Sequence, residues 1–174
     1  MVEIVPRPTS PAIIDTARSY LNIIDTNGKR NSKEIMKFIK SGGGRSGDNW
    51  CQHFVYHCHF VNGITEFRTG NANEYADRLK NKYGSFIGEV QDKYGLIVWI
   101  NPKTMNQRWK TGHIGFIEKK INKSFVRTIE GNTSWDNTSP DGRNYKGKTG
   151  VFPKVRSIKK GSKLGKNELR LIVQ

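Results

Sequence analysis

The order of the hydrophobic patterns constrains the fold of this chain most strongly. Apolar residues recur at helical spacing in four segments, which begin near Pro11, Ser32, Trp50 and Asn71. Strand-like runs follow at about 94–100, 113–119, 124–130, 150–158 and 168–173. Segregated helices and strands are typical of the α+β class with an antiparallel sheet. We therefore expect N-terminal helices packed on a C-terminal antiparallel sheet.

The length sets the number of domains. With 174 residues, of which 34% are hydrophobic, the chain can bury one core of ordinary size but is short for a second substantial module. We expect a single domain over residues 1–174. Its first helix should carry one apolar face, made of Ile13, Ile14, Ala17, Leu21 and Ile24.

A cysteine lies where the third helix is expected to begin, within Gly47-Asp48-Asn49-Trp50-Cys51-Gln52. Asp48 or Asn49 can cap this helix, and Trp50 opens it. In the first turn the backbone N–H groups are unpaired and the helix dipole is positive. Both effects stabilise a thiolate, so the pattern predicts that Cys51 is a nucleophile with a lowered pKa.

A possible base and its partner occur in a predicted hairpin. His113 lies at the start of one strand between Gly112 and Gly115, which allow another group to approach closely. Antiparallel pairing carries Glu130 of the next strand back toward His113, where a carboxylate can orient the imidazole and favour its charged form. Asn132 adds a polar group at the same rim.

Three segments resemble the signatures of the CHAP family: Trp50-Cys51-x-x-Phe54-Val55, Gly112-His113-Ile114-Gly115 and Glu130-Gly131-Asn132-Thr133. This family comprises cysteine- and histidine-dependent amidohydrolases and peptidases, related to the NlpC-type and papain-like enzymes that cut bacterial peptidoglycan. The resemblance implies a papain-like fold, with Cys51 as nucleophile, His113 as general base, and Glu130 and Asn132 as polar partners of the histidine.

One position departs from the family pattern. Leu96 stands where the family usually has an Asp, at the start of the strand that precedes His113. That Asp has none of the catalytic roles above, so we expect its loss to affect the shape of the groove more than the chemistry. The polar segment from Asn101 to Thr111 is expected to form a lid or a substrate-contacting loop.

Four further residues are candidates for substrate binding. Asn49 and Gln52 flank the cysteine. Trp50 and Trp135 can line a groove for glycan or peptide, although packing in the core or at the rim is an equal alternative for both. The backbone N–H of Cys51 is the candidate oxyanion donor, because a helix N-terminus directs donors at developing negative charge.

His53, His57 and His59 share the helix of Cys51 and Cys58 and suggest a zinc site. A second Cys/His cluster that would complete the ligand set is missing, so we expect no metal and no cofactor, with these histidines on the exposed side of the helix. Cys58 should pack in the core. Two helical turns separate it from Cys51, which prevents a disulfide between them.

The charge of the chain indicates its partners. The net charge is +15, and from Arg143 onward ten Lys or Arg face a single acid, Glu168. Such a field attracts polyanions, including anionic wall polymers. Specific nucleic-acid binding is not expected, since charge runs are usually solvated faces and no recognisable binding motif accompanies them.

These observations favour a peptidoglycan hydrolase that cuts an amide bond, as an N-acetylmuramoyl-L-alanine amidase or an endopeptidase. The alternative is a basic, non-catalytic protein that binds wall polymer or nucleic acid. The sequence shows no signal peptide and no transmembrane segment, so we expect synthesis in the cytoplasm and action on the cell wall or in the periplasm of a target cell. A phage lysin and an antibacterial effector both fit, and an effector would imply an immunity protein.

Overall fold

The computed structural model describes residues 9–66, 68–83, 94–104, 112–135 and 147–173. The helices are α1 (Pro11–Ser19), α2 (Lys33–Ser41), α3 (Cys51–Val61) and α4 (Ala72–Tyr83). They are followed by the strands β1 (Gly95–Ile100), β2 (Gly112–Lys120), β3 (Phe125–Ser134), β4 (Thr149–Ser157), β5 (Lys163–Leu164) and β6 (Asn167–Val173), with a short 3-10 helix at Pro102–Thr104. The predicted order of elements is confirmed. The two-residue β5 was not predicted.

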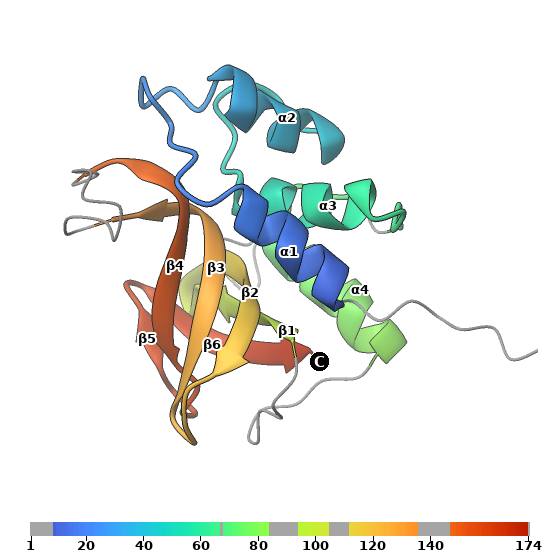
Figure 1. Ribbon diagram of the computed structural model, residues 1–174. Helices are drawn as coiled ribbons and strands as arrows, with labels where there is room; N and C mark the ends of the chain where they lie inside the picture. Colours follow the sequence, from blue (N-terminus) through green and yellow to red (C-terminus); the bar gives the residue numbers. More distant parts are fainter. Residues whose placement is uncertain (1–8, 67, 84–93, 105–111, 136–146, 174) are drawn as a thin grey trace, which may run out of the picture.

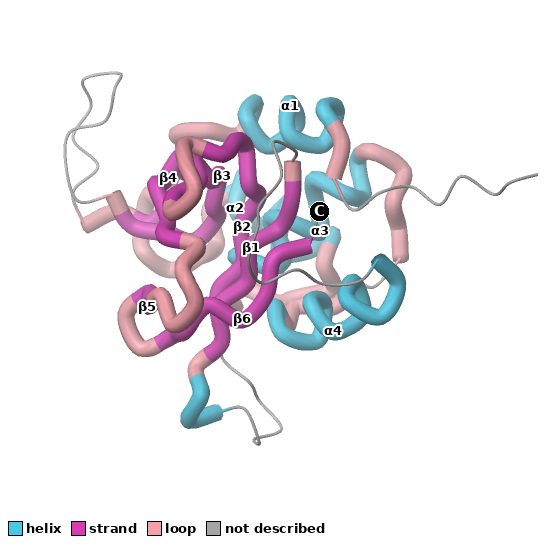
Figure 2. The backbone as a smooth tube through the Cα atoms, turned by 90° about the horizontal axis from the view of Figure 1, so that it is seen from below, coloured by secondary structure: helices cyan, strands magenta, loops and turns pink. Residues whose placement is uncertain are grey.

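The strands form one antiparallel sheet in the order β4-β3-β2-β1-β6-β5. The sheet curls, and the four helices lie together on one side of it (Figure 1). The view from below shows the same division, with the helices beside the strands rather than between them (Figure 2). The α+β class, with N-terminal helices packed on a C-terminal antiparallel sheet, is therefore confirmed.

Alternate residues of β1 divide the core between the two faces of the sheet. Leu96 and Val98 belong to the main cluster, which also contains the apolar faces of the helices. Ile97 and Trp99 belong to a second cluster on the opposite face. Leu96, where the family usually has an Asp, is thus a fully buried core residue.

Helix α3 is the centre of the helical layer. Every residue from Cys51 to His59 is buried, because the helix packs against α1, α2, α4 and the strands β2 and β3. Gly131 of β3 allows the closest approach: a Cβ atom there would lie 2.7 Å from the Cβ and Cγ of Phe54. The position of the first turn of α3 is therefore determined by packing on all sides.

The first helix is shorter than its apolar pattern predicts. It ends at Ser19 and does not continue to Ile24. Asn22 takes a left-handed backbone conformation (φ 68°), its N–H donates to the carbonyl of Val151 at 2.9 Å, and Ile24 forms a β-bridge with Gly150. The backbone after the helix thus pairs with β4, so the apolar residues there serve a strand-like segment.

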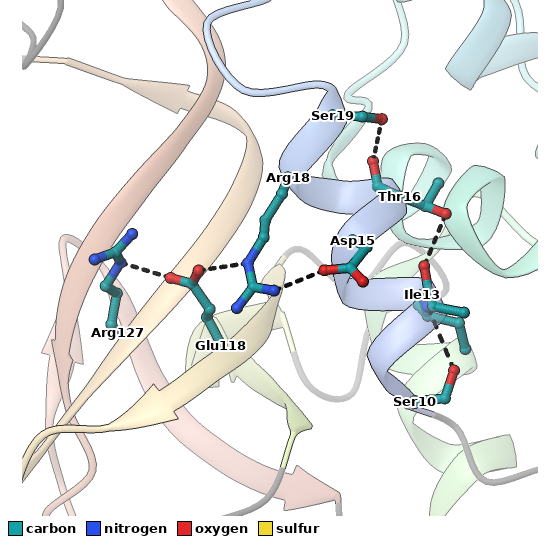
Figure 3. Close-up of polar contacts among 9 residues, drawn as sticks. Ser10, Ile13, Asp15, Thr16, Arg18, Ser19, Glu118 and Arg127 are labelled. Atoms are coloured by element: carbon teal, nitrogen blue, oxygen red, sulfur yellow. Dashed lines mark hydrogen bonds and ion pairs between the residues drawn. The ribbon is translucent and has the colours of Figure 1, made fainter.

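An ion-pair chain joins α1 to the sheet (Figure 3). The Nε of Arg18 donates to the buried carboxylate of Glu118 on β2 at 2.8 Å, and Arg127 of β3 lies 2.5 Å from the other oxygen of that carboxylate. The guanidinium of Arg18 also reaches Asp15 at 2.7 Å. Because Glu118 has two cationic partners, its burial costs less free energy than the burial of an unpaired carboxylate would.

Two sequence-based expectations concern other parts of the chain. Residues 105–111, most of the proposed lid or substrate-contacting loop, lie outside the described residues. Within the described ranges, none of the helices has the length and apolar character required to cross a membrane.

Candidate active site

The thiol of Cys51 lies at the first residue of α3, as the sequence pattern predicts, and its residue is 6% exposed. The capping differs from the prediction. Trp50 is the N-cap residue and forms no capping hydrogen bond through its side chain. Asp48 instead accepts the backbone N–H of Arg45 at 2.7 Å, and Asn49 accepts from Asn132. The first turn therefore keeps its N–H groups available for other acceptors.

Strands β2 and β3 bring an imidazole and a carboxylate together. The Nε2 of His113 lies 2.9 Å from the Oε2 of Glu130. Gly115 makes this possible, because a Cβ atom there would lie 2.6 Å from the Cγ of Glu130. With Nε2 engaged, Nδ1 is the ring nitrogen available to the thiol, and the side chains of Cys51 and His113 form a hydrogen bond.

Burial and charge shift the pKa of the Cys51 thiol in opposite directions. Burial disfavours the thiolate, but the hydrogen bond and the positive charge of His113 favour it, as do the backbone N–H groups of Ile114 and Gln52. The net result is a lowered pKa for Cys51. A thiolate of this kind is the form that attacks a carbonyl carbon.

The same balance raises the pKa of His113. Burial alone would lower it, but the hydrogen bonds and charges of Cys51 and Glu130 raise the pKa to about 10. For Glu130, burial favours the protonated form, and Arg156 and His113 outweigh it, so its pKa falls well below the ordinary range. The three groups are therefore a thiolate, an imidazolium and a carboxylate, with the imidazolium hydrogen-bonded to the other two.

Arg156 of β4 was missed by the sequence-based reasoning. Its guanidinium donates to both oxygens of Glu130, at 2.7 and 2.5 Å, and lies 5.7 Å from the ring centre of Trp99. The ring of Trp99 is in turn 5.7 Å from that of His113. Thr128 donates its hydroxyl to Glu130 at 2.6 Å. The carboxylate is therefore held from three sides.

Asn132 does not pair with the histidine in the contacts of the described residues. It lies at the irregularity between Glu130 and Thr133, with a left-handed φ of 54°. Its Nδ2 donates to the Oδ1 of Asn49 at 3.4 Å. This corrects the expectation that Asn132 is a direct polar partner of His113: it links β3 to the turn before α3.

The comparison with protein families identifies the same segment. The model of the CHAP domain matches residues 42–132, which is just over half of the chain and includes Cys51, His113, Glu130 and Asn132. The chain belongs to the CHAP family. It is accordingly a cysteine- and histidine-dependent amidohydrolase or peptidase. Neither the curated proteins nor the solved structures contain a match to it. Arg156 lies outside the segment that the CHAP model matches.

The four residues predicted to bind substrate differ in their exposure around this CHAP site. Asn49 is exposed and lines a pocket. Trp50 and Gln52 are fully buried, which corrects the prediction that they contact substrate. Trp50 stacks on Phe38 with ring centres 5.8 Å apart, so its alternative packing role holds. The amide atoms of Gln52 are buried without a hydrogen-bond partner among the described residues.

Trp135, the residue directly after β3 in this CHAP chain, is partly buried. Its ring lies 5.4 Å from that of Phe152, and the Nζ of Lys154 lies 5.0 Å from its centre. The contacts with β4 support the rim-packing alternative. Whether the ring also contacts substrate stays a prediction.

The three histidines of α3 are buried, which corrects the expectation that they lie on an exposed side. His53 and His59 are 2% and 1% exposed, and His57 is 9% exposed. His57 bonds to the hydroxyls of Tyr20 and Ser41, both at 3.0 Å. Helical periodicity cannot show this burial, because all sides of α3 are covered.

Both cysteines are free, and Cys58 is fully buried, as the sequence predicts. Burial raises the pKa of its thiol well above the ordinary value. Cys58 is therefore a core residue, unlike the CHAP cysteine at position 51. Within the described ranges, His, Cys, Asp and Glu side chains do not gather into a group of three that could hold a metal ion.

Proposed function

We propose that this CHAP protein is a peptidoglycan hydrolase that cleaves an amide bond of the cell-wall peptide through an acyl-enzyme on Cys51. The observation that carries the proposal is the line of side chains from Cys51 through His113 to Glu130, with its lowered thiol pKa. Family membership supports amide hydrolysis, and wall peptide is the substrate that the family resemblance implies.

The proposed reaction has two stages. The sulfur of Cys51 attacks the amide carbonyl carbon, and the resulting oxyanion faces the N–H groups at the start of α3. The C–N bond then breaks, and the imidazolium of His113 donates its proton to the departing amine. Water attacks the thioester carbon while His113 accepts a proton. The C–S bond breaks, which releases a carboxylate and restores the thiolate.

In this scheme Glu130 and Arg156 do not touch the substrate. Glu130 keeps the imidazole oriented through the 2.9 Å hydrogen bond and stabilises its charged form. Arg156 keeps that carboxylate ionised and in place. Arg156 is therefore a positioning residue.

The proposal includes two possible bonds. Cleavage between muramic acid and the first alanine would make the protein an N-acetylmuramoyl-L-alanine amidase, and cleavage within the stem or cross-bridge would make it an endopeptidase. We further propose that it acts as a phage-type lysin or as an antibacterial effector with an immunity protein. Its net charge of +15 would concentrate it on anionic wall polymers at low salt.

The test is the loss of turbidity of purified walls with the wild type and with Cys51→Ser. The wild type should solubilise the walls, and the variant should bind them without releasing material. Mass spectrometry of fragments from defined muropeptides then identifies the bond through its new amine and carboxylate. If both proteins bind and the wild type releases nothing, the hydrolase proposal is wrong. The high positive charge would then favour the alternative, a non-catalytic wall-polymer or nucleic-acid binding protein.

A further inference from the structure

A pocket of about 500 Å³ lies beside the turn that precedes Cys51. Its walls come from the turn before α3, from the segment around the start of α4 and from one residue of α3: Gly43, Gly44, Asp48, Asn49, His53, Thr69, Gly70, Asn71 and Glu74. The lining includes the carboxylates of Asp48 and Glu74 but neither lysine nor arginine. The carboxylates of the lining contrast with a chain of 30 basic and 15 acidic residues, but Glu74 is paired with Arg78, and Arg68 lies against Gly43 of the lining, so Asp48 supplies the negative charge that matters here.

The turn that lines the pocket contacts the strand of Glu130, and helix α4 contacts β2 beside His113. Asn49, which lines it, accepts a hydrogen bond from Asn132 on β3, two residues beyond Glu130. At the start of α4, the Nδ2 of Asn73 lies 2.7 Å from the position of a Cβ atom on Gly112, the residue before His113. If the protein acts as proposed above, a peptide held at Cys51 would extend a side chain toward this pocket.

The imidazole of His53 forms the base of the pocket and is surrounded by glycines. A Cβ atom on Gly44 would lie 2.5 Å from its Nε2, and one on Gly70 would lie 2.7 Å from its Cε1. The side chain is 3% exposed, and its Nδ1 is buried without a partner within the described residues. A side chain at either position would clash with the imidazole. The glycines therefore allow the ring to lie in this pocket.

Two possible acceptors of the pocket, the Oδ2 of Asp48 and the Nε2 of His53, have no donor side chain at hydrogen-bond distance among the described residues, although that Oδ2 accepts the backbone N–H of Arg45 at 2.7 Å. The Oδ2 of Asp48 lies 4.0 Å from the Nε2 of His53, which is too long for a hydrogen bond between them. A Cβ atom on Gly44 would lie 2.9 Å from that oxygen as well, so it would fill the gap between the two acceptors. Glu74 differs, because Thr69 and Arg78 already occupy its carboxylate.

The imidazole of His53 is suited to accept a hydrogen bond from a cation, because it is uncharged. Burial lowers the pKa of His53, and the nearby charge of Asp48 only partly opposes this. The ring is therefore neutral near pH 7, and in the tautomer that carries its proton on Nδ1 the Nε2 presents a lone pair. Across a gap of 4.0 Å, one nitrogen atom can lie at about 2.9 Å from both acceptors and donate one N–H to each.

We propose that this pocket is a subsite for a primary ammonium group of the substrate, held between the carboxylate of Asp48 and the Nε2 of His53. A metal ion fits less well, since no group of three metal-binding side chains forms in the described part of the chain. The inference rests on the proposed hydrolase function. It makes the enzyme selective for wall peptides with a free amine over peptides in which that amine is acylated or cross-linked.

The kinetic test compares a soluble wall peptide with a free lysine ε-amine and the same peptide with that amine acetylated. Wild type should cleave the free-amine peptide with a kcat/KM about tenfold higher, because the charge-assisted hydrogen bond is lost in the acetylated form. Asp48→Asn keeps an acceptor for the N–H of Arg45 but loses the charge, so the preference should fall to about onefold. Asp15→Asn, an exposed acid on α1, is the matched control and should keep the preference.

A binding measurement separates this subsite from the hydrolase function. The same two peptides are titrated into Cys51→Ala, and the imidazole resonances of His53 are followed by NMR. Tighter binding of the free-amine peptide, lost when Asp48→Asn is added, supports the subsite whether or not the wild type cleaves either peptide. Equal affinity for both peptides, or a preference that survives Asp48→Asn, overturns it.

Discussion

His57 and His113 are buried to the same extent, each 9% exposed, yet their environments have opposite effects. Burial, followed by the positive charge of Lys37, lowers the pKa of His57, whose ring bonds to two neutral hydroxyls. The pKa of His113 is raised to about 10, because its ring lies between a thiolate and a carboxylate. Burial alone thus does not determine the state of a histidine. The charges of the groups around the ring also decide whether a buried histidine is protonated.

Among variants that keep the thiol of Cys51, the largest expected effect comes from removing the charge of Glu130 behind His113. Glu130→Gln should lower kcat/KM by roughly 10²- to 10⁴-fold, since the imidazole loses its orienting carboxylate. It should also lower the pKa of His113 from about 10 toward its ordinary value, 6.5, which an NMR titration of the ring measures. Glu118→Gln is the control, because Glu118 is also a buried carboxylate with two arginine partners. Equal activity of the two variants would remove Glu130 from the mechanism.

The pH profile should reflect the thiolate–imidazolium pair. Activity should rise as pH passes the lowered pKa of Cys51 and fall, by about tenfold per pH unit, as pH rises through about 10, where His113 loses its proton. The same proton stabilises the fold fully below pH 6.5, and that contribution is lost as pH approaches 10. Rates on a soluble peptide from pH 5 to pH 11 check this. In Cys51→Ala, the pKa of His113 should fall, because the thiolate that raises it is gone.

A smaller effect is expected at Arg156. Arg156→Met should reduce kcat about tenfold and raise the pKa of Glu130, since the carboxylate loses its bidentate partner. The upper limb of the pH profile should then move to higher pH, because the charge of Glu130 is no longer offset by Arg156 and favours the imidazolium more strongly, a change that mere loss of stability would not cause. Arg156→Lys should restore part of the rate, and Arg127→Met, which removes a partner of Glu118, should leave the profile unchanged. An unaltered profile in Arg156→Met would show that the arginine has no positioning role.

The smallest effect on catalysis is expected at His57. Replacing it with Phe leaves the hydroxyl of Tyr20 without its imidazole partner and should reduce the free energy of unfolding by about 1–3 kcal/mol. The activity per folded molecule should stay within about twofold, because the ring bonds to Tyr20 and Ser41 and not to the residues of the proposed mechanism. Urea denaturation and the rate at a temperature where both proteins are folded check these two expectations. A large loss of rate without a loss of stability would contradict the structural assignment of His57.

Much of the fold was accessible from the sequence because its signals are local. The helical spacing around Phe38 and the strand run of β1 each depend on neighbours within a few residues. The end of α1 was not accessible, because residues 22–25 leave the helix to pair with β4, far along the chain. Local periodicity cannot report a competing partner more than a hundred residues away.

The candidate site likewise has residues whose roles local motifs predict and residues whose roles depend on distant contacts. The motifs around Cys51 and His113 predict their proximity, and the hairpin register places Glu130 near the ring. Arg156 was recognised only as part of the positive charge of the C-terminal region, because its contact depends on the register between β3 and β4. The burial of Gln52 and Trp50 depends on how many elements surround α3, which their own sequence neighbourhood does not reveal.

The sequence by itself determined the order of helices and strands and the position of a thiol at a helix start, since both follow from the spacing of neighbouring residues. Only the tertiary structure decided which buried histidine is charged, which arginine holds Glu130, and that Asp48 and His53 face the same pocket. The physical reason is that hydrogen bonding and desolvation depend on distances in space. Those distances are set when distant segments of the chain pack together.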